Sequence, residues 1–278
     1  MDTGKIRKLV RERYGSIARK ESSCCGPAPA CGEPNLAERV GRRIGYSEEE
    51  MEFVPQGANL GLGCGNPAAL ASLRRGETVL DLGSGAGFDC FLASREVGPE
   101  GRVIGVDMTP EMVEKARENA RRGGYANVEF RLGEIENLPV ADNTADVILS
   151  NCVINLVPNK KRVFEEAYRA LKPGGRLMIS DLVLSKPLPE WVTNIASAYV
   201  GCIAGAIRKG EYLKTIEAAG FREVEIVEES SFPTACFVSD PLVKEIVGNL
   251  SLSPGAVEEL EGTIASIRVY GIKPAGKN

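Results

Sequence analysis

Short apolar segments alternate with amphipathic segments between Gly76 and Ser180. The apolar segments have the length of strands, and they predict strands at residues 78–80, 103–106, 128–131, 145–150 and 176–180. The segments between them carry apolar residues at helical spacing and predict helices at residues 88–97, 110–122 and 162–171. Strands and helices that alternate in this way predict an α/β fold with a doubly wound parallel sheet.

The two ends of the chain follow other patterns. The first twenty residues combine basic side chains with apolar ones at helical spacing, which predicts an amphipathic helix packed on the domain with a solvated basic face. Residues 22–35 are rich in Gly, Pro and Ser and predict a mobile loop. After Ser180 the pattern changes, and it predicts two helices and two late strands, at residues 191–207, 211–219, 224–227 and 267–270.

The composition of the chain excludes several classes of protein. The 278-residue chain has a net charge of −4, which gives no reason to expect nucleic acid or an anionic membrane as a partner. It has no apolar run near the roughly 18 residues of a membrane span and no signal-peptide pattern, so a cytoplasmic protein with mostly reduced cysteines is expected. It contains no His, which excludes Ser-His-Asp and Cys-His hydrolase mechanisms.

A glycine-rich segment, Asp81-Leu82-Gly83-Ser84-Gly85-Ala86-Gly87, follows a predicted strand and opens a predicted helix. Glycine is favoured where a backbone turns tightly and approaches a ligand closely. The spacing Gly-x-Gly-x-Gly differs from the Gly-x-Gly-x-x-Gly of dinucleotide-binding proteins. We therefore expect this loop to hold a cofactor, through Asp81, Gly83, Ser84, Gly85 and Gly87.

Polar residues also follow the next strands of the predicted sheet. Asp107, followed by Met108, ends the second strand, where an acid takes the ribose hydroxyls of an adenosine cofactor. Glu134 and Ile135 follow the third strand, where Glu134 could accept a hydrogen bond from the adenine amino group. Alternatively, the two acids only cap the helices after them. Three acids at the carboxyl ends of three successive strands favour a ligand site, to which we add Asn151 after the fourth strand.

Three segments, Val79–Gly85, Val106–Met108 and Leu171–Gly175, resemble the motifs of class I S-adenosylmethionine methyltransferases. The resemblance covers residues 76–181 and implies a Rossmann-like sheet with S-adenosylmethionine as the cofactor. It also implies that the loop faces the amino acid part of this donor, with Asp81 near its amino group and Asp107 on its ribose. No Cys-x3-Cys-x2-Cys triplet is present, so a polar rather than a radical transfer is expected.

On this basis we expect three parts in the chain. Residues 1–60 would form the N-terminal helix and a mobile segment that contains cysteines. Residues 61–181 would bind S-adenosylmethionine. Residues 182–278 would form a smaller domain that binds the acceptor and completes the edge of the sheet.

The eight cysteines differ in their settings. Cys90 and Cys236 lie in apolar surroundings and are interpreted as packed residues. Cys64 lies in a glycine-rich loop where little would bury it, Cys152 directly follows the fourth strand, and Cys202 lies in a stretch of small residues. Their separations of 88 and 50 residues match no zinc-finger pattern. Spacing alone therefore does not show whether these three cysteines form a shared thiol site.

The segments around these three cysteines, Gly57–Pro67, Ser150–Leu156 and Tyr199–Ala206, closely resemble those of arsenite methyltransferases. This similarity runs from about Tyr46 over nearly the whole remaining chain. It implies that three catalytic cysteines bind trivalent arsenic, namely Cys64, Cys152 and Cys202. It also implies that one N-terminal cysteine takes part in capture or redox turnover, and three residues stay candidates for this role: Cys24, Cys25 and Cys31.

This implied chemistry is consistent from first principles. Thiolates are soft ligands that suit trivalent arsenic, and three of them would leave its lone pair exposed. That lone pair could attack the sulfonium methyl group without a base. We therefore expect transfer of methyl groups to arsenite, or to its glutathione conjugate, with a thiol reductant as a further partner. The products would be mono- and dimethylated arsenic, and the role would be detoxification.

Other functions stay open from the sequence. A methyltransferase for an organic carbon, oxygen or nitrogen acceptor commonly uses a base, and Glu and Tyr are available for that role. A non-catalytic metalloid or zinc sensor would bind through thiols without affinity for a methyl donor, and the glycine motif argues against it. An RNA methyltransferase is least favoured, because the chain is acidic and lacks a basic face studded with aromatic residues.

Overall fold

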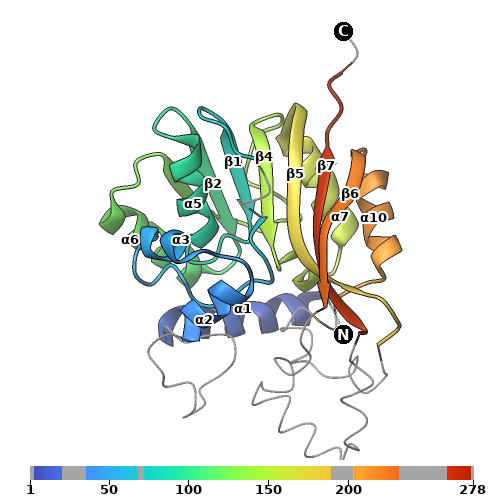
Figure 1. Cartoon of the computed structure of the whole chain (residues 1–278), viewed down its shortest axis with the longest axis horizontal. Helices are drawn as coiled ribbons and strands as arrows, with labels where there is room; N and C mark the ends of the chain where they lie inside the picture. The colour runs from blue at the N-terminus through green and yellow to red at the C-terminus, as the bar shows by residue number, and fades with distance from the viewer. Residues whose placement is uncertain are drawn as a thin grey trace, which may run out of the picture.

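A single mixed sheet forms the centre of the computed structural model, which describes residues 3–20, 36–67, 72–188, 203, 205–231 and 262–276. Across the sheet the strand order is β3-β2-β1-β4-β5-β7-β6 (Figure 1). The strands are β1 (Thr78–Leu82), β2 (Arg102–Asp107), β3 (Val128–Leu132), β4 (Ala145–Asn151), β5 (Leu171–Leu184), β6 (Arg222–Ser231) and β7 (Ile264–Ile272). The first five pair in parallel, and β7 runs antiparallel to β5 and β6. The predicted α/β fold is confirmed.

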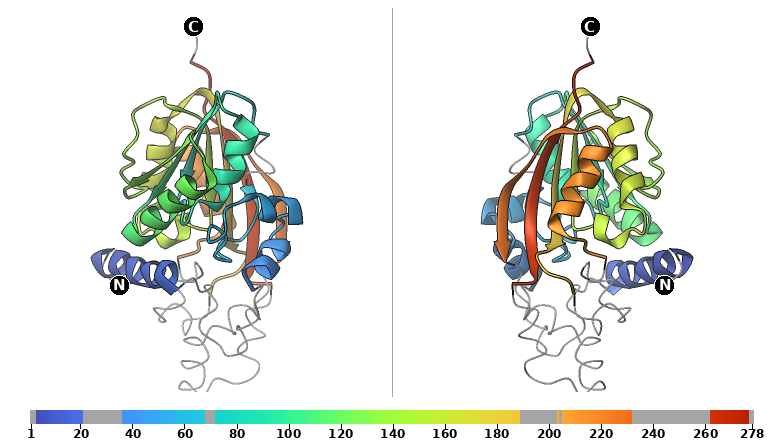
Figure 2. Two further views of the ribbon diagram at one scale, coloured as in Figure 1. Left: turned by 90° about the vertical axis from the view of Figure 1, so that its left-hand side faces the viewer. Right: turned by 90° about the vertical axis from the view of Figure 1, so that its right-hand side faces the viewer.

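Apolar side chains cover both faces of the central strands, because successive residues of a strand point to opposite sides. On β1, Leu80 packs in a cluster with side chains of α7 (Lys160–Ala170) and α10 (Lys209–Ala218). Its neighbour Val79 packs in a second cluster with side chains of α5 (Phe88–Val97) and α6 (Pro110–Gly123). Figure 2 shows α5 on one side of the sheet and α7 and α10 on the other. Burial on both faces explains why the central strands are nearly continuous apolar runs.

The predicted helices of the alternating region are present with small shifts at their ends. The helix predicted at residues 88–97 is observed with the same bounds, and the one predicted at 162–171 begins and ends slightly earlier. Helix α6 begins with Pro110 after Thr109 and is followed by Gly124 in a left-handed conformation. Pro at the first helical position and Gly after the last one are the signals by which sequence predicts such bounds.

The predicted N-terminal helix is α1 (Thr3–Lys20). Its apolar residues Ile6, Val10 and Ile17 are buried, as expected for an amphipathic helix that packs on the domain. Figure 1 shows α1 across one end of the sheet, and both views of Figure 2 agree. Two short helices, α2 (Leu36–Arg43) and α3 (Glu48–Phe53), follow it.

Beyond β5, only some of the predicted elements lie within the described residues. The late strands predicted at 224–227 and 267–270 lie within β6 and β7, and the helix predicted at 211–219 corresponds to α10. The loop predicted at 22–35 and most of the helix predicted at 191–207 lie outside the described residues. The division of the chain at residues 60 and 181 stays a prediction. In the described part of the chain, no helix combines the length and the apolar character needed to cross a membrane.

Candidate active site

The glycine loop connects β1 to α5 at the carboxyl edge of the sheet. Gly83 has φ of +76°, and a Cβ there would lie 2.5 Å from Val153 Cγ2. Gly87, which precedes α5, has φ of +96°, and a Cβ there would lie 2.7 Å from Phe130 Cζ. Both positions therefore require glycine, because L side chains rarely adopt this conformation and neither position has room for one.

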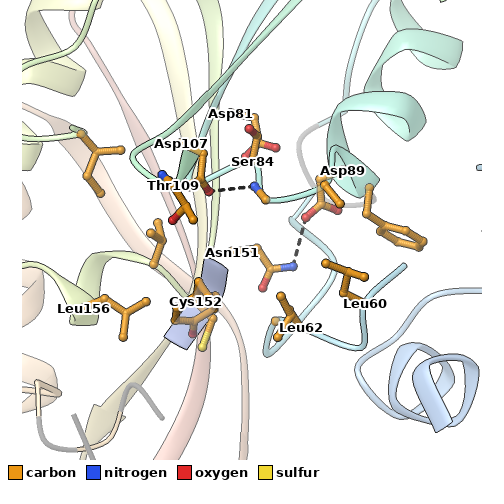
Figure 3. A pocket seen from close by; sticks show the side chains of 18 of the residues that line it. Leu60, Leu62, Asp81, Ser84, Asp89, Asp107, Thr109, Asn151, Cys152 and Leu156 are labelled. Carbon is orange, nitrogen blue, oxygen red and sulfur yellow. Dashed lines mark hydrogen bonds between the residues drawn. The ribbon is translucent and has the colours of Figure 1, made fainter. Parts of the chain in front are cut away.

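The loop is shaped to receive a ligand. Ser84 Oγ is buried without a hydrogen-bond partner among the described residues, and a Cβ at Gly85 would meet no atom within 4 Å. Both residues line one pocket, which the loop shares with Asp107. Asp107 accepts hydrogen bonds from the Gly85 N–H at 3.0 Å and the Thr109 N–H at 2.8 Å, which fixes its carboxylate at the edge of that pocket (Figure 3). These features fit an adenosine cofactor that carries an amino acid.

Two buried carboxyl groups lie beneath the loop. The Cys90 thiol donates to Asp81 Oδ2 at 3.2 Å, and Tyr46 Oη donates to Asp89 Oδ1 at 2.6 Å. Burial raises the pKa of the Asp81 carboxyl to about 8, and the nearby Asp89 charge adds to this effect. Burial also raises the pKa of Asp89, although its hydrogen bonds from Tyr46 and Asn151 oppose the rise. A cationic amino group placed near Asp81 would favour its ionised form.

The raised pKa of Asp81 predicts how stability depends on pH. Between about pH 4 and pH 8 the folded protein retains a proton that the unfolded chain has lost, so stability falls as pH rises through this range. The Asp81→Asn variant should lose much of this dependence. We expect its Tm without ligand to exceed that of the original protein by about 5 °C at pH 8, and by less at pH 5. The Tm of both proteins is measured between pH 5 and pH 8, with the exposed Asp142→Asn variant as a control. Profiles of Tm against pH that run parallel for the original protein and Asp81→Asn would contradict the prediction.

Asn151 connects Asp89 of α5 to the loop that carries Cys64. Its Oδ1 accepts a hydrogen bond from the Cys64 N–H at 3.0 Å, and its Nδ2 donates to the Gly65 carbonyl at 2.7 Å. The same Nδ2 lies 2.9 Å from Tyr46 Oη and donates to Asp89 Oδ2 at 3.1 Å. In Figure 3 its side chain lies between Asp89 and Cys152. Asn151 lines the predicted cofactor pocket, and it also holds the backbone of the Cys64 loop.

Two of the predicted arsenic ligands come together at this edge. Cys152 directly follows β4 and has φ of +57°, a left-handed conformation that is uncommon outside glycine and that clusters at functional sites. Cys64 is buried with 8% of its surface exposed, which differs from the exposed setting predicted for it. The cause is the packing of its loop against β5 and α1, where its neighbours include Ile6, Val10 and Leu182.

Asp181 is a member of this site that the sequence reasoning missed. One ligand atom each of Cys64, Cys152 and Asp181 lies within 4.8 Å of the other two. Asp181 is fully buried on β5, and burial raises the pKa of its carboxyl to about 6. A signal was present in the sequence, since Asp181 follows the predicted strand at 176–180, at the edge where the other site residues were sought.

Helix α1 lies over the side of the pocket that Glu134 and Glu136 line. Its Arg7 forms ion pairs with Glu136 at 2.6 Å and with Glu134 at 3.5 Å, and Arg11 lies 3.7 Å from Glu134. Arg7, Val10 and Tyr14 of this helix line the same pocket as the glycine loop. The predicted adenine contact of Glu134 therefore lies beneath a helix whose basic side chains already pair with it.

The other predicted site residues are placed as follows. Met108 and Ile135 line the pocket together with Glu134, and their predicted contacts with the cofactor stay predictions. Cys90 is completely buried, as its packing interpretation requires. The remaining cysteines lie outside the described residues: Cys24, Cys25, Cys31, Cys202 and Cys236.

Comparison with known proteins agrees with this geometry. A family model described as a methyltransferase domain matches residues 73–220. An arsenic(III) S-adenosylmethionine methyltransferase from Chlamydomonas reinhardtii superposes with a TM-score of 0.63 at 32% identity, covering 88% of this chain and 76% of that one. The arsenite methyltransferase of Aquipseudomonas alcaligenes is 35% identical over 97% of this chain and 74% of its own length. The chain belongs to the arsenite methyltransferase family.

A further member of this family extends the comparison. The arsenite methyltransferase of Halobacterium salinarum is 49% identical over 86% of this chain, and the match covers 62% of that protein. The match therefore leaves more than a third of this relative outside the comparison. Within the matched region, the sheet, the glycine loop and the family model identify an enzyme fold that uses S-adenosylmethionine.

Proposed function

We propose that this protein transfers methyl groups from S-adenosylmethionine to trivalent arsenic held by cysteine thiolates, as arsenite methyltransferases do. The observation that carries this proposal is the approach of Cys64 and Cys152 within 4.8 Å of each other. Cys152 lines the same pocket as Gly83, Gly85 and Asp107 of the donor site. Family membership supports arsenite as the acceptor.

The residues of the chain would act mainly by positioning the two reactants. When bound, S-adenosylmethionine supplies an electrophilic methyl group on a sulfonium sulfur. Asp107 and the glycine loop hold the donor side, whereas Cys64 and Cys152 hold the soft arsenic centre on the acceptor side. Asn151 fixes the distance between the two sides through its bonds to the Cys64 loop and Asp89. Such positioning can lower the free-energy barrier of a reaction by roughly 7–11 kcal/mol.

This chemistry requires no general base, because the arsenic lone pair forms the new bond to carbon. The electron pair of the broken carbon–sulfur bond remains on sulfur, and arsenic is oxidised by two electrons. A second methylation therefore needs two electrons, which two thiols supply when they form a disulfide. We infer that a thiol reductant such as glutathione is a partner, that Cys202 completes the arsenic site, and that mono- and dimethylated arsenic are the products.

A panel of acceptors tests the proposal against the organic-acceptor alternative. The protein is incubated with S-adenosylmethionine and glutathione, and formation of S-adenosylhomocysteine is measured with arsenite, a catechol, a primary amine or no acceptor. We expect turnover with arsenite at least 100 times above the other three reactions. Equal turnover with arsenite and without an acceptor, or faster turnover with an organic acceptor, would overturn the proposal.

A further inference from the structure

The Asp81 carboxyl receives a hydrogen bond from a thiol that the proposed chemistry does not use. Cys90 lies in the first turn of α5, is completely buried, and donates to Asp81 Oδ2 at 3.2 Å. Asp81 lies near the carboxyl end of β1 and lines the donor pocket with Gly83 and Asp107 (Figure 3). Because Cys90 is completely buried, it can act on a ligand in this pocket through the Asp81 carboxyl and not by direct contact.

The surroundings of Cys90 keep its thiol protonated. Burial raises the pKa of this thiol well above its ordinary value, and the neighbouring Asp81 and Asp89 charges add to the effect. The thiol therefore keeps its proton at neutral pH and is the donor in its hydrogen bond to Asp81. A protonated, completely buried thiol is also a poor ligand for arsenic, so it does not compete with Cys64 and Cys152.

The hydrogen bond from Cys90 favours the charged form of Asp81. Burial and the Asp89 charge raise the pKa of the Asp81 carboxyl, whereas the hydrogen bond from Cys90 lowers it. The charged form is the one that attracts a cation. S-adenosylmethionine carries a cationic amino group at neutral pH, and this group is the predicted contact of Asp81. The thiol therefore favours the state of Asp81 that this contact requires.

We propose that Cys90 is a positioning residue for the methyl donor, because its thiol orients the Asp81 carboxyl toward the amino group of the donor. Cys90 would then contribute to recognition of the amino acid part of S-adenosylmethionine, and not to recognition of its adenosine part. The inference rests on the donor side of the proposed function, since it assumes the predicted contact of Asp81. It does not depend on the identity of the methyl acceptor.

The test compares two ligands that share adenosine. S-adenosylhomocysteine carries the amino acid part, whereas 5′-methylthioadenosine lacks it. In the full-length protein, Cys90→Ala removes the hydrogen bond to Asp81. We expect the Kd of S-adenosylhomocysteine at neutral pH to rise about tenfold, equivalent to about 1.4 kcal/mol. The Kd of 5′-methylthioadenosine should stay within about twofold, which also shows that the pocket is folded. Equal weakening of both ligands, or of neither, would overturn the inference.

Two further variants separate the hydrogen bond from packing. Cys90→Ser restores a donor, and its Kd for S-adenosylhomocysteine should stay within about threefold of the original. A loss as large as that of Cys90→Ala would contradict the inference. Val97→Ala is the matched control, because Val97 is completely buried on the same helix and in the same apolar cluster. Both ligands should bind Val97→Ala within about threefold of the original. If this control lost S-adenosylhomocysteine selectively, packing and not the hydrogen bond would be the cause.

Asp81→Asn provides the reference for the predicted contact. It should weaken S-adenosylhomocysteine at least as much as Cys90→Ala does, and adding Cys90→Ala to it should change the Kd little further, because the thiol acts through the carboxylate. An unchanged Kd in Asp81→Asn would refute the predicted contact and the inference with it. No arsenic is present in these measurements, so their failure would leave the proposed acceptor untouched, which the panel of acceptors tests separately.

Discussion

The Cys152→Ser variant is expected to lose at least about 100-fold in the rate of arsenite methylation, with its affinity for S-adenosylmethionine changed by less than about threefold. A hydroxyl group is a hard, weakly acidic ligand and does not replace a thiolate on arsenic. Serine differs from cysteine by one atom, so the left-handed backbone at this position and the hydrogen bond from its N–H to the Ser180 carbonyl should persist. Initial rates and calorimetric donor binding, measured on the same preparation, check both parts.

A neighbouring residue provides the matched control for this experiment. Ser150 lies two residues earlier on β4, is completely buried, and its Oγ has no hydrogen-bond partner among the described residues. Ser150→Ala should therefore retain methyl transfer within about threefold. If Cys152→Ser kept the rate of this control, the thiol site would not hold the acceptor.

The second large effect is expected on the donor side. Gly83→Ala should weaken S-adenosylmethionine binding by at least about 100-fold, because the new methyl group would lie 2.5 Å from Val153 and the backbone has φ of +76°. The loop must then move, and with it the Gly83 and Ser84 N–H groups that donate to the Val106 carbonyl at 2.8 and 3.1 Å. Donor affinity is measured by calorimetry without an acceptor.

Gly76 supplies the control for backbone strain. It precedes β1 at the opposite end of the strand, has φ of +82°, and a Cβ there would meet no atom within 4 Å. Gly76→Ala therefore introduces the same kind of strain without the collision, and it should reduce stability but leave donor affinity within about threefold. Equal loss of donor affinity in both variants would show that strain alone, and not the shape of the loop, controls binding.

The sequence was most informative where local patterns and the fold agree. The alternation of apolar and amphipathic segments predicted the parallel strands, because burial on both faces leaves a strong apolar signal in each strand. The position of Asp107 was predictable for the same reason, since the carboxyl ends of parallel strands meet at one edge. The late strands were predicted, but their order and direction depend on long-range pairing, which no local pattern encodes.

The parts of the site that escaped prediction depend on contacts between distant segments. Tyr46 reaches Asp89 from 43 residues away, and the Asn151 side chain contacts Cys64 across 87 residues. The predicted contact of Asn151 with the cofactor stays a prediction, and its hydrogen bonds to the Cys64 loop were not predicted. The burial of Cys64 was also missed, because a glycine-rich loop looks exposed in sequence until α1 and β5 pack over it.

A single-turnover experiment with a labelled donor tests the central claim most directly. The protein is loaded with one equivalent each of arsenite and S-adenosylmethionine carrying a CD₃ group, with glutathione present, and the products are identified by mass spectrometry. We predict monomethylated arsenic that carries CD₃, in equal amount to S-adenosylhomocysteine, and neither product in Cys152→Ser. Unlabelled arsenic together with CD₃ on glutathione or on the protein, or the same labelled product from Cys152→Ser, would contradict it.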